Sequence, residues 1–230
     1  MPAQNRTLPT SVAQRKPKRK RVRAPIAAAM PSAVEPMLPT SRQFPFSDPE
    51  WIFEPKWDGY RALCLIEHGS VRFMSRNRKE LTERFPELAR IHNAVKATSA
   101  ILDGEIVGLD KNDLPCFEDL QNRKKCSVVY FAFDLLMLNE TDLRNEPLIE
   151  RKNLLKRILK KASHLGYTDH IVGEGEQLFA ALSKLGLEGM IAKKADSRYA
   201  GGRTKEWLKV KTRAGKDLIQ KRIESWGHKG

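Results

Sequence analysis

Hydrophobic and polar residues alternate along much of the chain after residue 50, which is the pattern of strands with one buried and one exposed face. Such runs predict strands at 51–55, 60–67 and 71–75, and the intervening His-Gly-Ser at 68–70 predicts a turn. The first part of the folded region is therefore predicted to contain short strands joined by tight connections.

Two longer runs, residues 101–109 and 127–138, are rich in residues that favour strands. The second run is apolar enough to be a central strand that is buried on both faces. Two further strands are predicted at 189–194 and 206–211. The chain should be built mainly on β-strands.

Apolar residues at helical spacing lie between these predicted strands. They predict helical structure from residue 81 to 95, amphipathic helices at 148–165 and 176–185, and a last helix at 216–226. Strands outnumber helices, and the early connections are short. The predicted fold class is α+β, with mixed, mainly antiparallel sheets flanked by helices.

The composition excludes several classes of protein. The 230 residues are 40% hydrophobic, which suffices for a core, and no run approaches the roughly 18 apolar residues of a membrane span. The three cysteines, Cys64, Cys116 and Cys126, are odd in number and lack the paired spacing of a zinc site. No membrane partner, zinc site or disulfide framework is expected, and a reducing cytoplasm fits best.

The formal net charge of +14 indicates a polyanionic partner, for which nucleic acid is the commonest candidate. Residues 1–34 hold eight basic residues and no acid, and they predict a disordered basic arm. Its run at 17–23 fits a nucleic-acid arm, a nuclear-import signal or a solubilising tail. The globular domain is expected at 35–212, followed by a basic C-terminal helix at 213–230.

Three segments in the first part of this domain contain residue types that can do chemistry. The segment EPKWDGYRA places Lys56 after a strand and before a glycine that allows a tight turn, as a nucleophile at a sheet rim requires. Glu105 lies inside an apolar strand, where a carboxylate is costly unless it is paired or bound to a metal. The aromatic strand at 130–136 is core, or presents one ring for stacking on a planar base.

Two more segments lie near the C-terminus. LEGMIAKK has Glu188 at one end of a strand and Lys193 at the other, and WLKVK places Lys209 and Lys211 on one strand face. Two adjacent lysines form either a solvated edge or a phosphate clamp. Each of the five segments alone also fits an ordinary structural role, such as a hairpin turn or a core strand.

Together and in this order, the segments resemble the ATP-grasp-like nucleotidyltransferase core of ATP-dependent DNA ligases, in particular the bacterial kind used in end joining. The similarity runs from about residue 36 to residue 211 and includes SRN at 75–77, LTERFPEL, LQNRK and LGLEGM. It implies an ATP-dependent ligase adenylation domain at 35–212.

The resemblance also implies roles for individual residues. Lys56 would attack the α-phosphorus of ATP to form a lysyl-AMP phosphoramidate, while Lys209 and Lys211 favour its neutral amine and hold the α-phosphate. Glu105 and Glu188 would bind a divalent metal, Mg²⁺ or Mn²⁺, and the ribose. The other expected nucleotide contacts are Glu54 at the adenine amino group, Phe133 on one face of adenine with Met190 or Ile191 on the other, Arg61 and Arg76 at ribose and phosphate, and Asp58 and Lys193 facing the nucleotide or its phosphates.

The implied activity transfers AMP to a 5′-phosphate for joining to a 3′-hydroxyl in nicked or broken double-stranded DNA, in repair or recombination. Two alternatives stay open. One is a non-catalytic module that binds nicks or ends, and the other is an RNA ligase or capping-type nucleotidyltransferase.

Members of this family usually continue into an OB-fold domain. The 19 residues after Lys211 are too few for a five-stranded barrel. The expectation is a stand-alone adenylation domain for which a partner protein could supply the OB-fold function. It would act in the bacterial cytoplasm at the nucleoid, or in the nucleus if the protein is eukaryotic.

Overall fold

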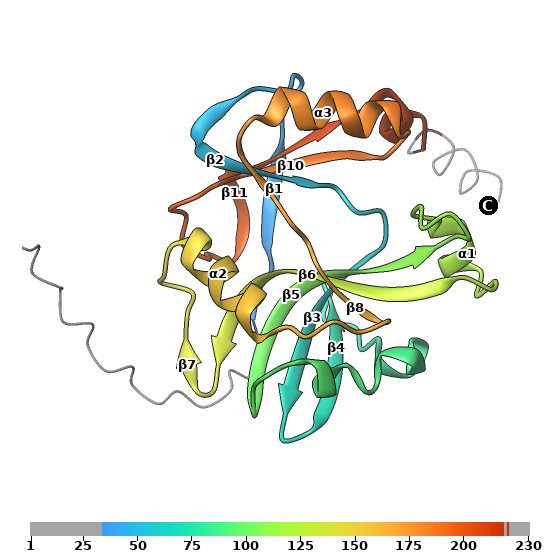
Figure 1. The fold of residues 1–230 in the computed structure, drawn as a ribbon, viewed down its shortest axis with the longest axis vertical. Helices are drawn as coiled ribbons and strands as arrows, with labels where there is room; N and C mark the ends of the chain where they lie inside the picture. The colour runs from blue at the N-terminus through green and yellow to red at the C-terminus, as the bar shows by residue number, and fades with distance from the viewer. Residues whose placement is uncertain (1–33, 219, 221–230) are drawn as a thin grey trace, which may run out of the picture.

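The computed structural model describes residues 34–218 and 220, which form two β-sheets that face each other (Figure 1). Sheet A has the strand order β1-β11-β10-β2-β9, and sheet B has the order β4-β3-β5-β6-β7 with β8 paired to β6. The strands are β1 (Met37–Ser41), β2 (Asp48–Pro55), β3 (Tyr60–Glu67), β4 (Ser70–Ser75), β5 (Ser99–Leu109), β6 (Ser127–Leu138), β7 (Thr141–Asp142), β8 (Leu165–Tyr167), β9 (Ile171–Gly173), β10 (Gly189–Lys194) and β11 (Gly202–Lys211).

Most neighbouring strands in both sheets are antiparallel, and two pairs are parallel. In sheet A, β1 pairs in parallel with β11, and in sheet B, β8 pairs in parallel with β6. The remaining neighbours, including the long β5–β6 pair, are antiparallel. The predicted α+β class with mixed, mainly antiparallel sheets is confirmed.

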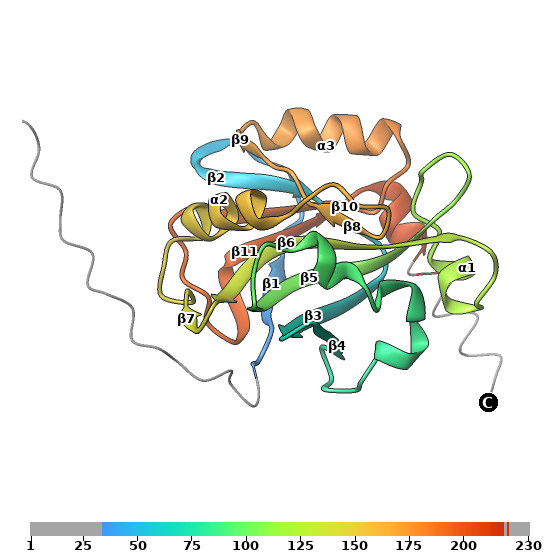
Figure 2. The same cartoon turned by 60° about the horizontal axis from the view of Figure 1, so that its bottom comes forward.

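A hydrophobic core lies between the two sheets and joins them. Sheet A contributes Met37, Ile52 and Trp207, and sheet B contributes Leu63 and Phe133, all with little or no exposure. Each such side chain stabilises the fold by about 1.5–3 kcal/mol through removal of apolar surface from water. Figure 2 shows sheet A stacked over sheet B, with β1 running between them at one side.

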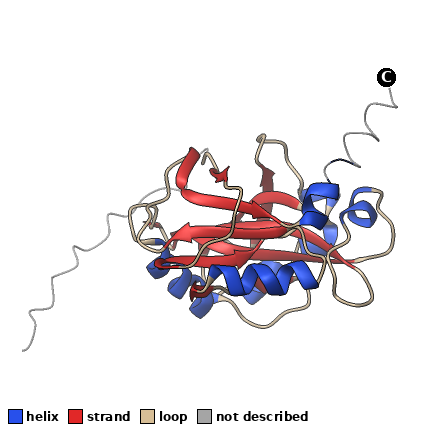
Figure 3. Ribbon diagram, turned by 90° about the horizontal axis from the view of Figure 1, so that it is seen from above, coloured by secondary structure: helices blue, strands red, loops and turns tan. Residues whose placement is uncertain are grey.

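Helices lie against both sheets (Figure 3). Helix α3 (Gly175–Lys184) packs on β2 and β10 of sheet A, whereas α2 (Leu148–Ile158) packs on β6 of sheet B. The short α1 (Phe117–Gln121) lies against β5. Leu148 at the start of α2 belongs to the core between the two sheets, whereas Leu155 and Ile158 near its end pack in the other core cluster of sheet B.

The predicted helical stretch at 81–95 is not one α-helix. It forms three 3₁₀ turns, η1 (Thr82–Arg84), η2 (Pro86–Leu88) and η3 (Ile91–Ala94). Pro86 has no N–H to continue a helix, and it forces the preceding Phe85 out of the helical region, to φ −128° and ψ 67°. The apolar residues still reach the core, because Leu88 and Ile91 are buried against sheet B.

The predicted helix at 148–165 ends early, at Ile158. Leu159 takes an extended conformation, and the Lys160 N–H donates to the carbonyl of Ala94 at 2.8 Å instead of continuing the helix. Residues 165–167 then pair with β6 as β8. Tertiary pairing outweighs helical periodicity in this segment.

The two terminal predictions fall largely outside the described residues. The basic arm at 1–34 lies outside except for Val34, and of the C-terminal helix only residues 213–218 and 220 are described, all of them helical. Within the described part of the chain, no helix has the length and apolar character that a membrane crossing requires.

Candidate active site

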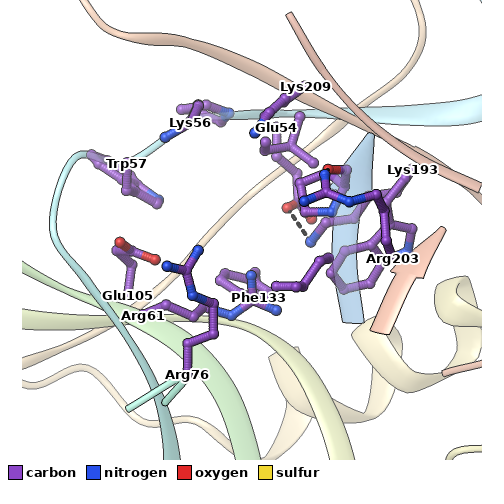
Figure 4. A pocket seen from close by; sticks show the side chains of 15 residues that line it. Glu54, Lys56, Trp57, Arg61, Arg76, Glu105, Phe133, Lys193, Arg203 and Lys209 are labelled. Carbon is purple, nitrogen blue, oxygen red and sulfur yellow. Dashed lines mark hydrogen bonds and ion pairs between the residues drawn. The ribbon is translucent and has the colours of Figure 1, made fainter. Parts of the chain in front are cut away.

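A cleft of about 210 Å³ opens between the facing sides of the two sheets (Figure 4). Its walls combine charged and aromatic side chains from strands that are far apart in the sequence. The lining residues are Leu38, Pro39, Glu54, Pro55, Lys56, Trp57, Arg61, Arg76, Glu105, Phe133, Ile191, Lys193, Arg203, Trp207 and Lys209.

Strand alternation decides which residues of sheet A reach the cleft. On β11, Trp207 and Lys209 face the cleft, whereas Val210 is buried under α3. On β10, Ile191 lines the cleft, and Met190 points to the opposite face, where it is completely buried. Of the two residues expected on the second face of the base, only Ile191 lines the cleft.

Lys56 follows directly after β2, and its position is fixed through its backbone and its side chain. Its N–H donates to the carbonyl of Gly189 at 2.9 Å, and its Nζ pairs with Glu188 Oε2 at 2.5 Å. The other oxygen of Glu188 lies 3.6 Å from Lys211 Nζ. Glu188 and Lys211 do not line the cleft, but they lie directly beside the candidate nucleophile.

The loop after Lys56 is anchored by aromatic stacking and by close backbone packing. The Trp57 ring stacks on Phe131 with a centroid distance of 4.1 Å and an interplanar angle of 13°, and its Nε1 donates to Thr168 Oγ1 at 3.0 Å. A Cβ on Gly59 would lie 2.1 Å from the Ile106 carbonyl oxygen, so no larger residue fits. Asp58 lies half-buried in this loop but is not a lining residue.

Glu54 and Lys193 form a buried charged pair at the cleft, and a third residue completes the group. Glu54 Oε2 lies 2.6 Å from Lys193 Nζ, and its Oε1 lies 2.5 Å from Lys152 Nζ. Burial opposes ionisation of Glu54, but the two ammonium groups outweigh it and hold the pKa of this carboxyl below its usual value. Burial lowers the pKa of Lys193 to about 8, with Glu54 opposing and Lys152 adding to the shift.

Arg61 lies beneath the cleft and joins the two sheets. Its guanidinium forms a bidentate pair with Asp103, both N–O distances being 2.6 Å, and donates to the Met37 carbonyl at 3.2 Å. The Tyr199 hydroxyl donates to the same carboxylate at 2.6 Å. Arg61 also lies 4.5 Å from the centroid of Phe133, so it holds that ring from below.

Glu105 projects from β5 into the cleft, and its environment favours the protonated form. Burial raises the pKa of Glu105 to about 7, against the attraction of Lys56 and Arg61 and with further repulsion from Glu188. Glu105 and Glu188 together offer hard oxygen ligands of the kind that Mg²⁺ takes. Among the described residues, no group of three or more His, Cys, Asp or Glu side chains could hold a metal alone. A divalent ion fits here only together with oxygens of a ligand.

Basic residues gather on the side of the cleft formed by β11. Burial lowers the pKa of Lys209, and the neighbouring charges of Lys211, Lys56 and Arg203 lower it further, against Glu188. Repulsion among these cations is relieved when an anion binds between them. This side of the cleft is suited to phosphate.

The structure brings most of the predicted site residues together. Those that line the cleft are Glu54, Lys56, Arg61, Arg76, Glu105, Phe133, Ile191, Lys193 and Lys209. Sequence reasoning missed Trp57, Arg203 and Trp207 in the lining, and the buried partners Asp103 and Lys152. The alternation of β11 could have identified Trp207, since it shares a face with Lys209. Asp103 lies inside β5, within the strand predicted at 101–109, but its type gave no sign that it pairs with Arg61.

Comparisons with known proteins agree with this arrangement. A family model described as ATP dependent DNA ligase domain matches residues 30–211. The multifunctional non-homologous end joining DNA repair protein LigD of Mycobacterium tuberculosis (strain H37Rv) is 40% identical over 164 residues, which are 70% of this chain and 22% of that protein. The chain therefore spans only about a fifth of the length of this relative.

Two further similarities involve a shorter relative and a solved structure. The SPbeta prophage-derived DNA ligase-like protein LigB of Bacillus subtilis (strain 168) is 31% identical over 183 residues, which are 77% of this chain and 67% of that protein. The structure of mycobacterial DNA ligase D complexed with ATP and MES matches with a TM-score of 0.69 and 36% identity, covering 77% of this chain and 60% of the other. With the family match extending over both sheets and the cleft between them, this chain belongs to the ATP-dependent DNA ligase domain family.

Proposed function

We propose that this chain carries out the adenylation chemistry of DNA ligation, with Lys56 as the residue that becomes covalently linked to AMP. The observation that carries the proposal is the position of the Lys56 amine in a cleft with two chemically different sides. Figure 4 shows Lys56, Trp57 and Glu105 on one side, and Lys193 and Arg203 on the other.

The nucleotide would lie across this cleft. The base would stack on Phe133, with Glu54 and Lys193 at its polar edge and Ile191 on its other face. The phosphates would extend toward Lys209, whose charge neighbours those of Lys211 and Lys56. This places the α-phosphate near Lys56.

In the chemical step, the Lys56 nitrogen forms a bond to the α-phosphorus, and the bond from that phosphorus to the pyrophosphate oxygen breaks. Attack requires the neutral amine, so the Lys56 ammonium must first lose a proton. Glu188 Oε2, 2.5 Å away, is positioned to accept that proton. In the second half of the reaction, AMP passes from Lys56 to the 5′-phosphate of DNA.

Glu105 and Glu188 are the residues that would hold Mg²⁺ or Mn²⁺ together with the triphosphate oxygens. The bound ion would neutralise negative charge on the phosphates. Both carboxylates are hard oxygen donors next to the Lys56 amine, and the triphosphate oxygens would complete the coordination.

The substrate we propose is nicked or broken double-stranded DNA, and the pathway is end-joining repair. This rests on the name of the M. tuberculosis relative and on the net charge of +14, which suits a polyanion. The activity would then be carried out where chromosomal DNA lies, in the cytoplasm at the nucleoid.

Incubation with α-³²P-labelled ATP and Mg²⁺ tests the proposal. We expect a label on the protein that survives SDS, disappears in EDTA and is absent from Lys56→Arg, because arginine keeps the charge but cannot deprotonate. Lys205→Arg, an exposed position on β11, is the matched control and should label normally. An unlabelled wild type would instead indicate a module that binds DNA ends without catalysis.

A further inference from the structure

Lys152, on α2, is completely buried, as is its neighbour Arg151, whereas Lys156 one turn further along the helix is 62% exposed. The Lys152 Nζ lies 2.5 Å from Glu54 Oε1 and donates to the backbone carbonyls of Thr168 at 3.0 Å and Phe133 at 3.3 Å. The ammonium also lies 4.7 Å from the centroid of the Tyr167 ring. One buried cation thus contacts three segments of the chain.

Burial of an ammonium group costs free energy unless an anion and several acceptors surround it. Here the only anion in direct contact among the described residues is Glu54, which already pairs with Lys193. Two buried cations therefore share one carboxylate. Lys193 alone would neutralise the charge of Glu54, so the burial of Lys152 beside the same carboxylate needs a separate explanation.

Lys152 does not line the cleft, but it contacts residues that do. It holds one oxygen of Glu54, and it is bonded to the backbone of Phe133, whose ring faces the cleft. Its third partner, Thr168, accepts the hydrogen bond from Trp57 Nε1. The ammonium supports the end of the cleft assigned to the base from behind.

The two charged groups that line the cleft at that end, Glu54 and Lys193, differ in whether they accept or donate hydrogen bonds. Lys193 Nζ is buried and pairs with Glu54, yet it has no well-aligned hydrogen-bond acceptor among the described residues. It remains able to donate, because an ammonium has three N–H groups. Glu54, ionised between two cations, can only accept. The pair therefore presents one acceptor beside one donor.

This order of groups distinguishes the two purines. Adenine presents an amino donor next to the N1 acceptor, which complements a carboxylate beside an ammonium. Guanine presents an oxygen acceptor next to an N1–H donor, which is the reverse. Selection of adenine then depends on Glu54 remaining ionised and held in one orientation, since a protonated carboxyl could donate to guanine and a rotated carboxylate would no longer face the amino group of adenine.

We propose that Lys152 is a positioning residue that makes the cleft selective for adenine over guanine nucleotides by holding the Glu54 carboxylate from behind. The inference rests on the proposed function, in which the cleft binds ATP through its base. It concerns only the binding of the base and leaves the reaction at Lys56 unchanged.

The test is the full chain with Lys152→Met, which removes the charge and keeps the volume of the side chain. Equilibrium binding of ATP and GTP is measured by calorimetry, and labelling of Lys56 by each nucleotide gives kcat and KM. We expect the preference for ATP over GTP to fall about 10- to 100-fold, as for a recognition group displaced by about 1 Å, through KM more than kcat.

Lys156→Met is the matched control, since Lys156 lies one turn further along α2, is 62% exposed and pairs only loosely with Asp169 at 3.5 Å. Its nucleotide preference should equal that of the wild type. Partial unfolding of Lys152→Met does not affect the result, because the ratio of the two nucleotides cancels the concentration of folded protein.

A double variant covers the case in which Lys152→Met does not fold. Glu54→Gln with Lys152→Met removes two of the three buried charges, and it should show the same reduced preference as Glu54→Gln alone, because Lys152 acts through Glu54. An undiminished ATP preference in Lys152→Met, or a further loss in the double variant, would overturn the proposal. Binding without labelling in the wild type would refute the proposed chemistry but not the role of Lys152.

Discussion

Lys56 and Glu188 are separated by 132 residues in the sequence, yet their side chains form an ion pair of 2.5 Å at the edge of the cleft. The ion pair fixes the position of the Lys56 side chain beside the cleft. In the reaction proposed above, Glu188 would both hold the nucleophile in place and take its proton.

The first prediction follows from this pair. Glu188→Gln keeps the shape of the side chain but cannot accept the Lys56 proton, so the rate of AMP labelling should fall by roughly 100-fold. Single-turnover labelling with α-³²P-ATP measures it. Glu206→Gln, at an exposed position on β11, should label at the wild-type rate. Equal rates for the two variants would remove Glu188 from the chemical step.

The second prediction concerns Asp103, which holds the Arg61 guanidinium that links the two sheets. Asp103 is completely buried and serves both Arg61 and Tyr199. Asp103→Asn leaves the guanidinium without a buried counter-charge, so the free energy of unfolding should drop by about 3–5 kcal/mol. Urea denaturation measures this change.

Asp142→Asn is the comparison for that experiment. Asp142 pairs with Arg144 at 2.6 Å, but both side chains are more than one-third exposed, so its loss should cost at most about 1 kcal/mol. If the two variants lost equal stability, the buried Arg61–Asp103 pair would stabilise the fold no more than the exposed Arg144–Asp142 pair.

The third prediction is a pH dependence of stability. Burial raises the pKa of Glu105 from 4.5 to about 7, so the folded chain binds more protons than the unfolded chain between these values. The free energy of unfolding contributed by this group therefore falls as pH rises from 4.5 to 7. Glu105→Gln removes that loss, and above pH 7 it should be more stable than the wild type by roughly 1–3 kcal/mol.

Urea denaturation at several pH values, without nucleotide or divalent ions, tests this. The advantage of Glu105→Gln should shrink toward zero near pH 4.5. Glu118, whose side chain is 77% exposed, is the control position: the difference in unfolding free energy between Glu118→Gln and the wild type should not change with pH. A difference that did not change with pH would show that Glu105 is ionised as readily in the folded chain as in the unfolded one.

The fourth prediction concerns the basic residues at 1–34. Eight basic residues without an acid should contact phosphates rather than base edges. Deletion of residues 1–30 should weaken binding to nicked duplex and flatten the plot of log affinity against log salt by several units, at about 0.9 per contact. Labelling of Lys56 should be unchanged. A salt dependence equal to that of the full chain would show that this segment does not bind DNA.

Much of the sheet structure could be predicted because alternation and turn residues agree along the chain. Strands β3, β6 and β10 have the predicted bounds. The helical predictions at 81–95 and after residue 158 were wrong, because apolar spacing does not register a proline or a strand that pairs through tertiary contacts. The proline acts locally on Phe85, whereas the pairing of β8 with β6 joins two segments, and apolar periodicity carries no information on either effect.

In the candidate site too, some residues could be predicted from the sequence and others could not. Resemblance to a family led to Lys56, Glu105 and Phe133, whose residue types reveal their chemistry. It did not lead to Lys152, because a lysine in an amphipathic helix looks like a solvated one. Its burial follows from the position of Glu54 on a different sheet, about 100 residues earlier in the chain.

The parallel pairing of β1 with β11 has a consequence for synthesis on the ribosome. Met37 lies opposite Gly202, and both strands line the cleft, β1 through Leu38 and Pro39 and β11 through Trp207 and Lys209. A nascent chain that has emerged only to residue 200 contains Lys56 but lacks one wall of the cleft. Because β11 supplies that wall, the cleft can form only after translation has passed residue 211. Until then, the edge of β1 stays available to other chains in the cell.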